Sequence, residues 1–184
     1  MIGISEESLK RVERILASVP GGAEKALAGA MNRGLSRIRT ESKRQVREVY
    51  AVQSSVFSSA ANIRLGKANT GNLSGYVSFS GYKIPLYKFR VTSDSAGKHV
   101  RAAVKKGGDT EFRHAFVAHM RNGHTGIFER KTSERFPIEE KMGLAAAQMV
   151  KNEKIVSAVE KDAQELVSKR LEHEIERILN GYGR

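Results

Sequence analysis

Cysteine is absent from the sequence of 184 residues. The chain therefore has no disulfide, no thiolate ligand for a metal and no cysteine nucleophile, and this composition suits a reducing cytoplasm. No run of 18 apolar residues occurs, so we expect no membrane-spanning helix. The N-terminal stretch MIGISEESLKRVERIL lacks a basic segment followed by a long apolar one, and we expect no secretory signal there.

Catalytic signatures are also missing. The sequence contains no GxGxxG, no P-loop and no GxSxG motif. Glu139 and Glu140 are adjacent carboxylates, but the side chains of chain neighbours point apart and cannot share an acid–base role. We therefore expect a protein that is not an enzyme, with no catalytic residue and no cofactor.

Three histidines are spaced five residues apart, at His114, His119 and His124. This spacing turns side chains by roughly 140° on a helix and to opposite faces on a strand, so the three do not converge on one ion. The dipeptide Asn122-Gly123 is the preferred two-residue turn of a β-hairpin. We expect a structural turn with positive φ at Asn122 and Gly123, and no metal site.

Two long segments repeat apolar residues at helical spacing, at 23–50 and 152–180, and a shorter one does so at 5–18. Ser5 is a candidate N-cap, and Asn180-Gly181 is a helix stop signal. The apolar stripe of 23–50 starts with alanine and glycine, which permits close approach of another backbone. It predicts packing against the chain's own sheet or a neighbouring subunit.

Short segments rich in Val, Ile, Phe and Tyr predict strands between the helices, with a loop at 92–98. These strands are expected at 62–68, 74–80, 84–91, 99–106, 113–121 and 125–130. The predicted class is α+β, an antiparallel sheet covered on one face by long N-terminal and C-terminal helices. We expect one domain over residues 1–184, with a short helix in 1–20, a long helix region in 23–60, the sheet in 62–130 and a C-terminal helix in 144–180.

The net charge is +12, from 32 Lys and Arg against 20 Asp and Glu. If 88–90 pairs with 101–105, Lys88, Arg90, Arg101 and Lys105 gather on one sheet face. Such a face is either solvated surface or a contact for an acidic partner, which is a neighbouring protein or nucleic acid. The pattern of charges leaves these interpretations open.

The stretch AFVAHMRNGHTGIFERK, followed after a polar loop by RFPIEE, resembles the minor tail protein Z family of tailed bacteriophages and prophages. The helix containing ALAGAMNRGLSRIRTES and the strand IPLYKF are also similar to that family, so the resemblance covers roughly 20–180. The matching positions are packing and turn residues: Ala115, Phe116, Arg121, Asn122, Gly123, Arg130, Arg135, Phe136, Pro137 and Ile138.

The resemblance implies a non-enzymatic virion component that acts in tail completion and head–tail joining through protein–protein contacts. It implies a place in the virion tail after assembly in the host cytoplasm, with other tail or neck proteins as partners and no membrane. Fold-level analogy adds a homo-oligomeric ring and nonspecific contact with DNA. The alternative is a basic nucleic-acid-binding protein that uses the positive sheet face. It is the less favoured reading, because the sequence has no recognition-helix signature and its aromatic residues share the apolar strand face.

Overall fold

The computed structural model describes residues 3–93 and 99–181. The chain divides into two compact units, and α2 passes from one into the other. The first unit comprises Met1–Ser42, Ile63–Ser78 and Glu153–Arg184, and the second comprises Lys43–Asn62 and Phe79–Asn152. Most of the loop expected at 92–98 lies outside the described residues.

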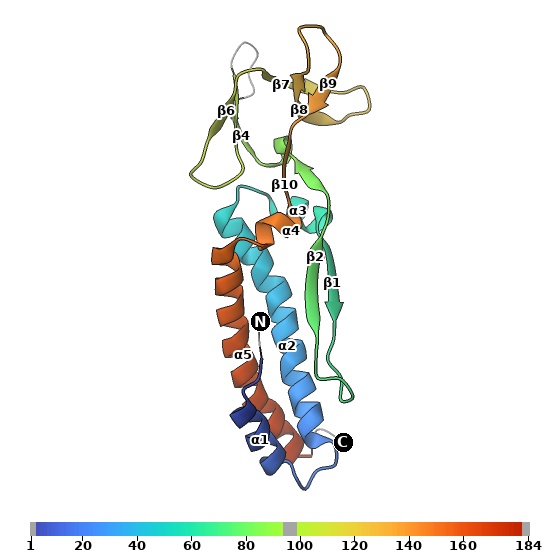
Figure 1. Cartoon of the computed structure of the whole chain (residues 1–184), viewed down its shortest axis with the longest axis vertical. Helices are drawn as coiled ribbons and strands as arrows, with labels where there is room; N and C mark the ends of the chain where they lie inside the picture. The colour runs from blue at the N-terminus through green and yellow to red at the C-terminus, as the bar shows by residue number, and fades with distance from the viewer. Residues whose placement is uncertain (1–2, 94–98, 182–184) are drawn as a thin grey trace. The chain divides into compact units, whose positions relative to one another are not determined.

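Three helices dominate the first unit: α1 (Glu6–Ile15), α2 (Gly22–Val49) and α5 (Glu153–Leu179) (Figure 1). The predicted cap of α1 is confirmed, because the Ser5 hydroxyl accepts a hydrogen bond from the Ser8 backbone N–H at 3.2 Å. The predicted stop after α5 is also confirmed. Gly181 has a φ of +79°, and its N–H donates to the Ile178 carbonyl at 3.1 Å.

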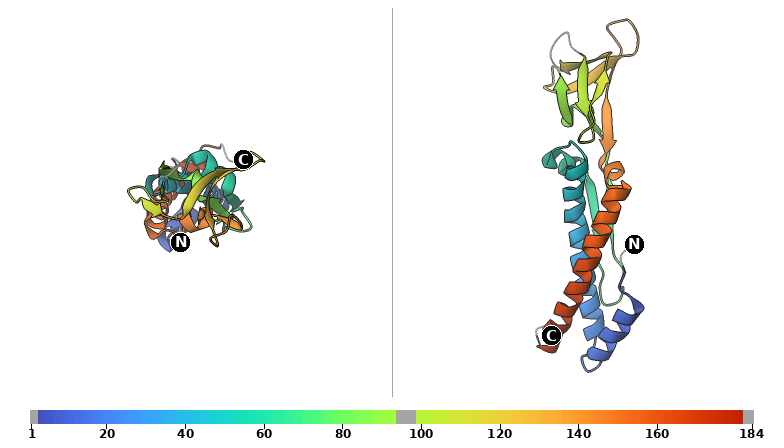
Figure 2. Two further views of the ribbon diagram at one scale, coloured as in Figure 1. Left: turned by 90° about the horizontal axis from the view of Figure 1, so that it is seen from above. Right: turned by 90° about the vertical axis from the view of Figure 1, so that its left-hand side faces the viewer.

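The apolar stripe of α2 packs on helices of the same chain. Figure 1 and the right-hand view of Figure 2 show α2 and α5 side by side. A Cβ added at Gly34 would clash with the Val167 side chain, so the small residues of α2 admit α5, a packing partner that the sequence does not predict. The shared core consists of Val12, Leu16, Ala26, Leu27, Ala30, Val167, Leu171, Ile175 and Ile178.

Ion pairs between α2 and α5, and within α5, also stabilise the first unit. Arg37 Nε lies 2.5 Å from Asp162 Oδ2 across α2 and α5. The hydrogen bonds that Arg37 donates to Asp162, together with the negative charge of that carboxylate, raise the pKa of Arg37, so this guanidinium stays cationic. Glu174 is a buried carboxylate on α5, and it accepts hydrogen bonds from Arg170 at 3.0 Å and Arg177 at 2.8 Å. These partners offset the cost of burying its charge.

A hairpin formed by β1 (Asn62–Gly66) and β2 (Tyr76–Ser80) is attached to α2 in the first unit. The Asn32 side chain donates to the Ala68 carbonyl and accepts from the Ala68 N–H, each at 2.9 Å. Ala68 is 5% exposed, so its backbone groups depend on this amide for their hydrogen bonds. One side chain thus fastens the loop of the hairpin to the long helix.

The second unit contains the remaining short elements. Its helical segments are α3 (Ser54–Ala60), the 3-10 helix η1 (Leu86–Lys88) and α4 (Ala146–Val150). Its strands are β3 (Lys83–Pro85), β4 (Arg90–Ser93), β5 (Val100–Ala103), β6 (Thr110–Phe112), β7 (Ala115–His119), β8 (Thr125–Arg130), β9 (Ile138–Glu140) and β10 (Met142–Ala145). They form three antiparallel sheets, ordered β3-β10, β4-β5-β6 and β7-β8-β9.

The α+β class is confirmed, but the strands within the described residues form four small sheets instead of one. The strand predicted at 84–91 is interrupted by η1, and the one predicted at 99–106 ends at Ala103. The sequence pattern does not predict β6, β9 or β10, because each has only three or four residues and no clear alternation.

The hairpin of β7 and β8 is confirmed, with a longer turn than predicted. The strands pair as far as His119 with Thr125, which leaves residues 120–124 as the loop. Gly123 has a φ of +81°, whereas no described residue other than glycine has a positive φ, so the prediction for Asn122 is wrong. The longer loop needs only one left-handed residue, and the Asn122 side chain instead accepts from the His124 N–H at 3.0 Å.

Candidate functional site

The four basic residues singled out in the sequence are all exposed, but they do not share one strand pair. Lys88 ends η1, and Lys105 forms a bridge with Tyr50 after β5 has ended. Only Arg90 and Arg101 fit the predicted face. Arg90 lies opposite Ala103, which is two residues along β5 from Arg101 and therefore on the same side.

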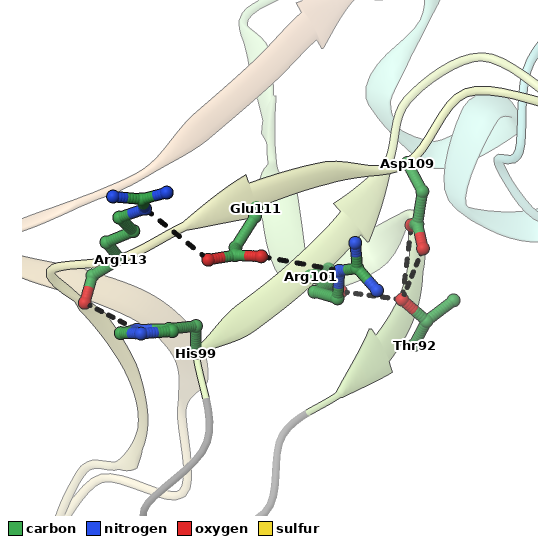
Figure 3. A network of polar contacts seen from close by, with 6 residues as sticks. All are labelled: Thr92, His99, Arg101, Asp109, Glu111 and Arg113. Atoms are coloured by element: carbon green, nitrogen blue, oxygen red, sulfur yellow. Dashed lines mark hydrogen bonds and ion pairs between the residues drawn. The ribbon is translucent and has the colours of Figure 1, made fainter.

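Arg101 is engaged in a network across β4, β5 and β6 (Figure 3). It lies opposite Glu111 in the sheet, with Arg101 Nε 3.8 Å from Glu111 Oε2. The other carboxylate oxygen of Glu111 lies 3.6 Å from Arg113 Nε. Beside this network, the Thr92 hydroxyl lies 3.0 Å from Asp109 Oδ2. Because its charge already faces a carboxylate, Arg101 contributes less to attracting a partner than its exposure suggests.

A larger basic feature lies in the second unit, and we call it the basic groove. It is a surface hollow of about 720 Å³ between the last turns of α2, the segment leading to α3, and the η1–β4 region. Five cationic side chains and one carboxylate line it, together with uncharged residues. The charged lining residues are Arg44, Arg47, Glu48, Lys88, Arg90 and Lys106.

Backbone hydrogen bonds hold the walls of the groove in place. Ala51 N–H donates to the Val104 carbonyl, and Lys106 N–H donates to the Val49 carbonyl, both at 2.9 Å. The chain leaving α2 is thereby paired with the chain leaving β5. Tyr50 and Phe89 also line the groove, but they are 3% and 6% exposed and therefore belong to the packed interior.

The groove cations differ from the other cations of the fold in their partners. Within residues 3–93 and 99–181, Arg47, Lys88, Arg90 and Lys106 have no side-chain ion pair. Elsewhere, arginines such as Arg37 are paired with carboxylates. Exposed cations on several sides of one hollow produce a positive potential that attracts anions.

The sequence pattern predicts Lys88 and Arg90 as contact residues, but it does not predict that Arg44, Arg47 and Lys106 lie at the same site. Arg44 and Arg47 are three residues apart and so lie on one helix face, a signal that the sequence contains. Which part of the chain that face meets depends on the pairing of 49–51 with 104–106. No local pattern predicts that pairing.

The histidines have separate surroundings. His119 Nδ1 lies 2.7 Å from the Thr125 hydroxyl, and His124 Nε2 lies 2.8 Å from Glu140 Oε1. His114 is exposed just before β7. Among the residues that the structure describes, no group of three His, Cys, Asp or Glu side chains is placed to hold a metal ion.

Comparison with known proteins gives one result. The family described as prophage minor tail protein Z matches residues 6–182. No curated protein and no solved structure matches the chain. None of the described helices is long and apolar enough to cross a membrane.

Proposed function

This chain belongs to the prophage minor tail protein Z family, and we propose that it acts in tail completion and in joining the tail to the head. The family places the protein in the virion tail as a structural component that contacts other tail proteins. The finer role is our proposal. The family match over residues 6–182 carries it, because the match extends over nearly all of this sequence.

Protein–protein contact is the proposed mode of action. Tyr82 is 93% exposed, beside a shallow hollow of about 530 Å³ that includes the half-buried residues Val56, Ala60 and Pro85. Exposed aromatic residues next to apolar surface are typical of protein interfaces. We propose that tail or neck proteins bind here, and that copies of the chain assemble into a ring at the tail end.

The exposed residues Lys88, Arg90, Arg101 and Lys105 are proposed as a second contact for a partner in the particle. Attraction between opposite charges speeds association and fixes the orientation of the partners more than it raises affinity. These residues therefore serve to guide an acidic neighbour into place. Nucleic-acid binding is the second candidate function, and the basic groove favours it.

The test is a phage or prophage from which this gene has been deleted. We expect complete-length tails that do not join DNA-filled heads, with infectivity restored when the purified protein is added to a mixture of tails and heads. The protein should then be found in purified tails. Normal head joining without the gene, or absence of the protein from tails, would refute the proposed role.

A further inference from the structure

We propose that the basic groove binds the phosphate backbone of duplex DNA without reading its sequence. The residues assigned to this contact are Arg44, Arg47, Lys88, Arg90 and Lys106, which line the groove. This binding is an activity of the purified protein alone. It does not depend on the proposed role in head–tail joining.

The positive charge of the groove favours an anionic ligand. The groove brings together five cations and a single carboxylate, Glu48. Four of these cations have no ion pair among the described residues, so no protein carboxylate competes with a bound phosphate for them. A chain with a net charge of +12 also attracts a polyanion over a longer range than the groove alone does. Phosphate contacts by Lys and Arg supply most of the affinity in nonspecific DNA binding.

The apolar residues of the groove distinguish DNA from an acidic protein as the occupant. A protein partner gains most of its affinity from aromatic or aliphatic anchors that become buried at the centre of the interface. Tyr50, Val52 and Phe89 are 3%, 7% and 6% exposed, so the core already covers them and they offer little surface to a partner. An accessible lining dominated by Lys and Arg is typical of protein–DNA interfaces, which are much more positively charged than protein–protein interfaces.

The same burial indicates how DNA is bound. Proteins that hold single strands stack bases on accessible aromatic rings. Tyr50 and Phe89 are too buried to serve in this way. The wall formed by α2 presents Arg44 and Arg47, and Arg and Lys are the side chains that chiefly contact DNA phosphates. The contact is therefore with the backbone, and duplex DNA is the expected ligand.

Fluorescence anisotropy with two 30-base-pair duplexes of unrelated sequence tests the proposal. We expect the same affinity for both duplexes and a steep salt dependence. Five phosphate contacts correspond to a slope of about −4.5 in log K against log salt, or a loss of about 500-fold between 50 and 200 mM. Removing three contacts should reduce the slope to about −1.8. The variant for this step combines Arg47→Ala, Arg90→Ala and Lys106→Ala.

A matched control removes the same charge elsewhere. Arg14, Arg33 and Lys169 are exposed, lie outside the groove and have no ion pair among the described residues. Their triple alanine variant should keep the full slope.

Equal loss of DNA affinity in both triple variants would show that binding depends on net charge, and would overturn the assignment of the groove as the binding site. Tighter binding to single-stranded DNA than to duplex DNA would overturn the assignment of duplex DNA as the ligand. Binding of polyglutamate in place of DNA would assign the groove to an acidic protein. All these assays use the purified protein, so their failure leaves the tail-assembly test unaffected.

Discussion

Gly123 is the residue on which the β7–β8 turn depends. Its φ of +81° is strained for any residue with a Cβ, and the neighbouring Asn122 has no such requirement. We predict that Gly123→Val lowers the free energy of unfolding by about 1–2 kcal/mol. Asn122→Ala should cost less, because it removes only the bond to the exposed His124 N–H. Urea denaturation of both variants measures the difference. Equal costs would show that the turn is wrongly described.

The Asn32 side chain stabilises the attachment of the β1–β2 hairpin to α2. Asn32→Ala would leave both backbone groups of buried Ala68 without their partner, and we predict a loss of about 1–3 kcal/mol in unfolding free energy. Asn72→Ala is the control. Asn72 lies in the same hairpin but makes its side-chain bonds to Ser74 in an exposed loop. If thermal denaturation shows the two variants to be equally stable, the contact between Asn32 and Ala68 is not structural.

Single residues with a local signal are predictable from sequence, and those with a distant partner are not. Ser5 and Gly181 are correctly predicted because a cap and a stop depend on the next few residues. Asn32 gives no signal, because its partner is 36 residues away. Asn122 is wrongly predicted because the dipeptide Asn-Gly also fits a longer loop.

At the scale of elements, the contact of α2 with α5 can be tested at Gly34. Alanine favours a helix over glycine by about 1 kcal/mol. In the native chain, a Cβ at this position would clash with the Cγ2 methyl of Val167, so we predict that Gly34→Ala is destabilising. The Val167 Cβ lies 3.9 Å from that position, an ordinary contact. In a Val167→Ala background, Gly34→Ala should therefore become stabilising.

The measurement is a double-mutant cycle by urea denaturation, in which the sign of the Gly34→Ala effect changes with residue 167. An effect of the same sign in both backgrounds would contradict the helix packing. The two long helices themselves are predictable, since the apolar stripes at 23–50 and 152–180 are long and regular. Their packing partner is not predicted, because a stripe rich in alanine and glycine fits a helix, a sheet or another subunit equally well.

Across the whole molecule, the sequence predicts the amount of positive charge but not its arrangement. The alternation around Arg90 and Arg101 indicates the face that these two share. This alternation does not indicate that η1 interrupts the strand. It also does not indicate that the end of α2 pairs with the segment after β5. The basic groove follows from those two features. The α+β class and the family are predicted because each depends on patterns within short stretches.

We predict that incorporation of the protein into tails depends on the positive charges of Lys88, Arg90 and Lys105. Reversing Lys88, Arg90 and Lys105 to Glu changes the net charge from +12 to +6 and alters only exposed side chains. Arg101 remains unchanged in this variant. Arg101→Glu would place a second carboxylate directly opposite that of Glu111 and destabilise the sheet. We expect an intact circular dichroism spectrum together with loss of the protein from purified tails. A second variant with Arg101→Glu added measures the cost in stability separately. Normal incorporation and infectivity of the triple variant would refute the proposed contact between these residues and a partner in the particle.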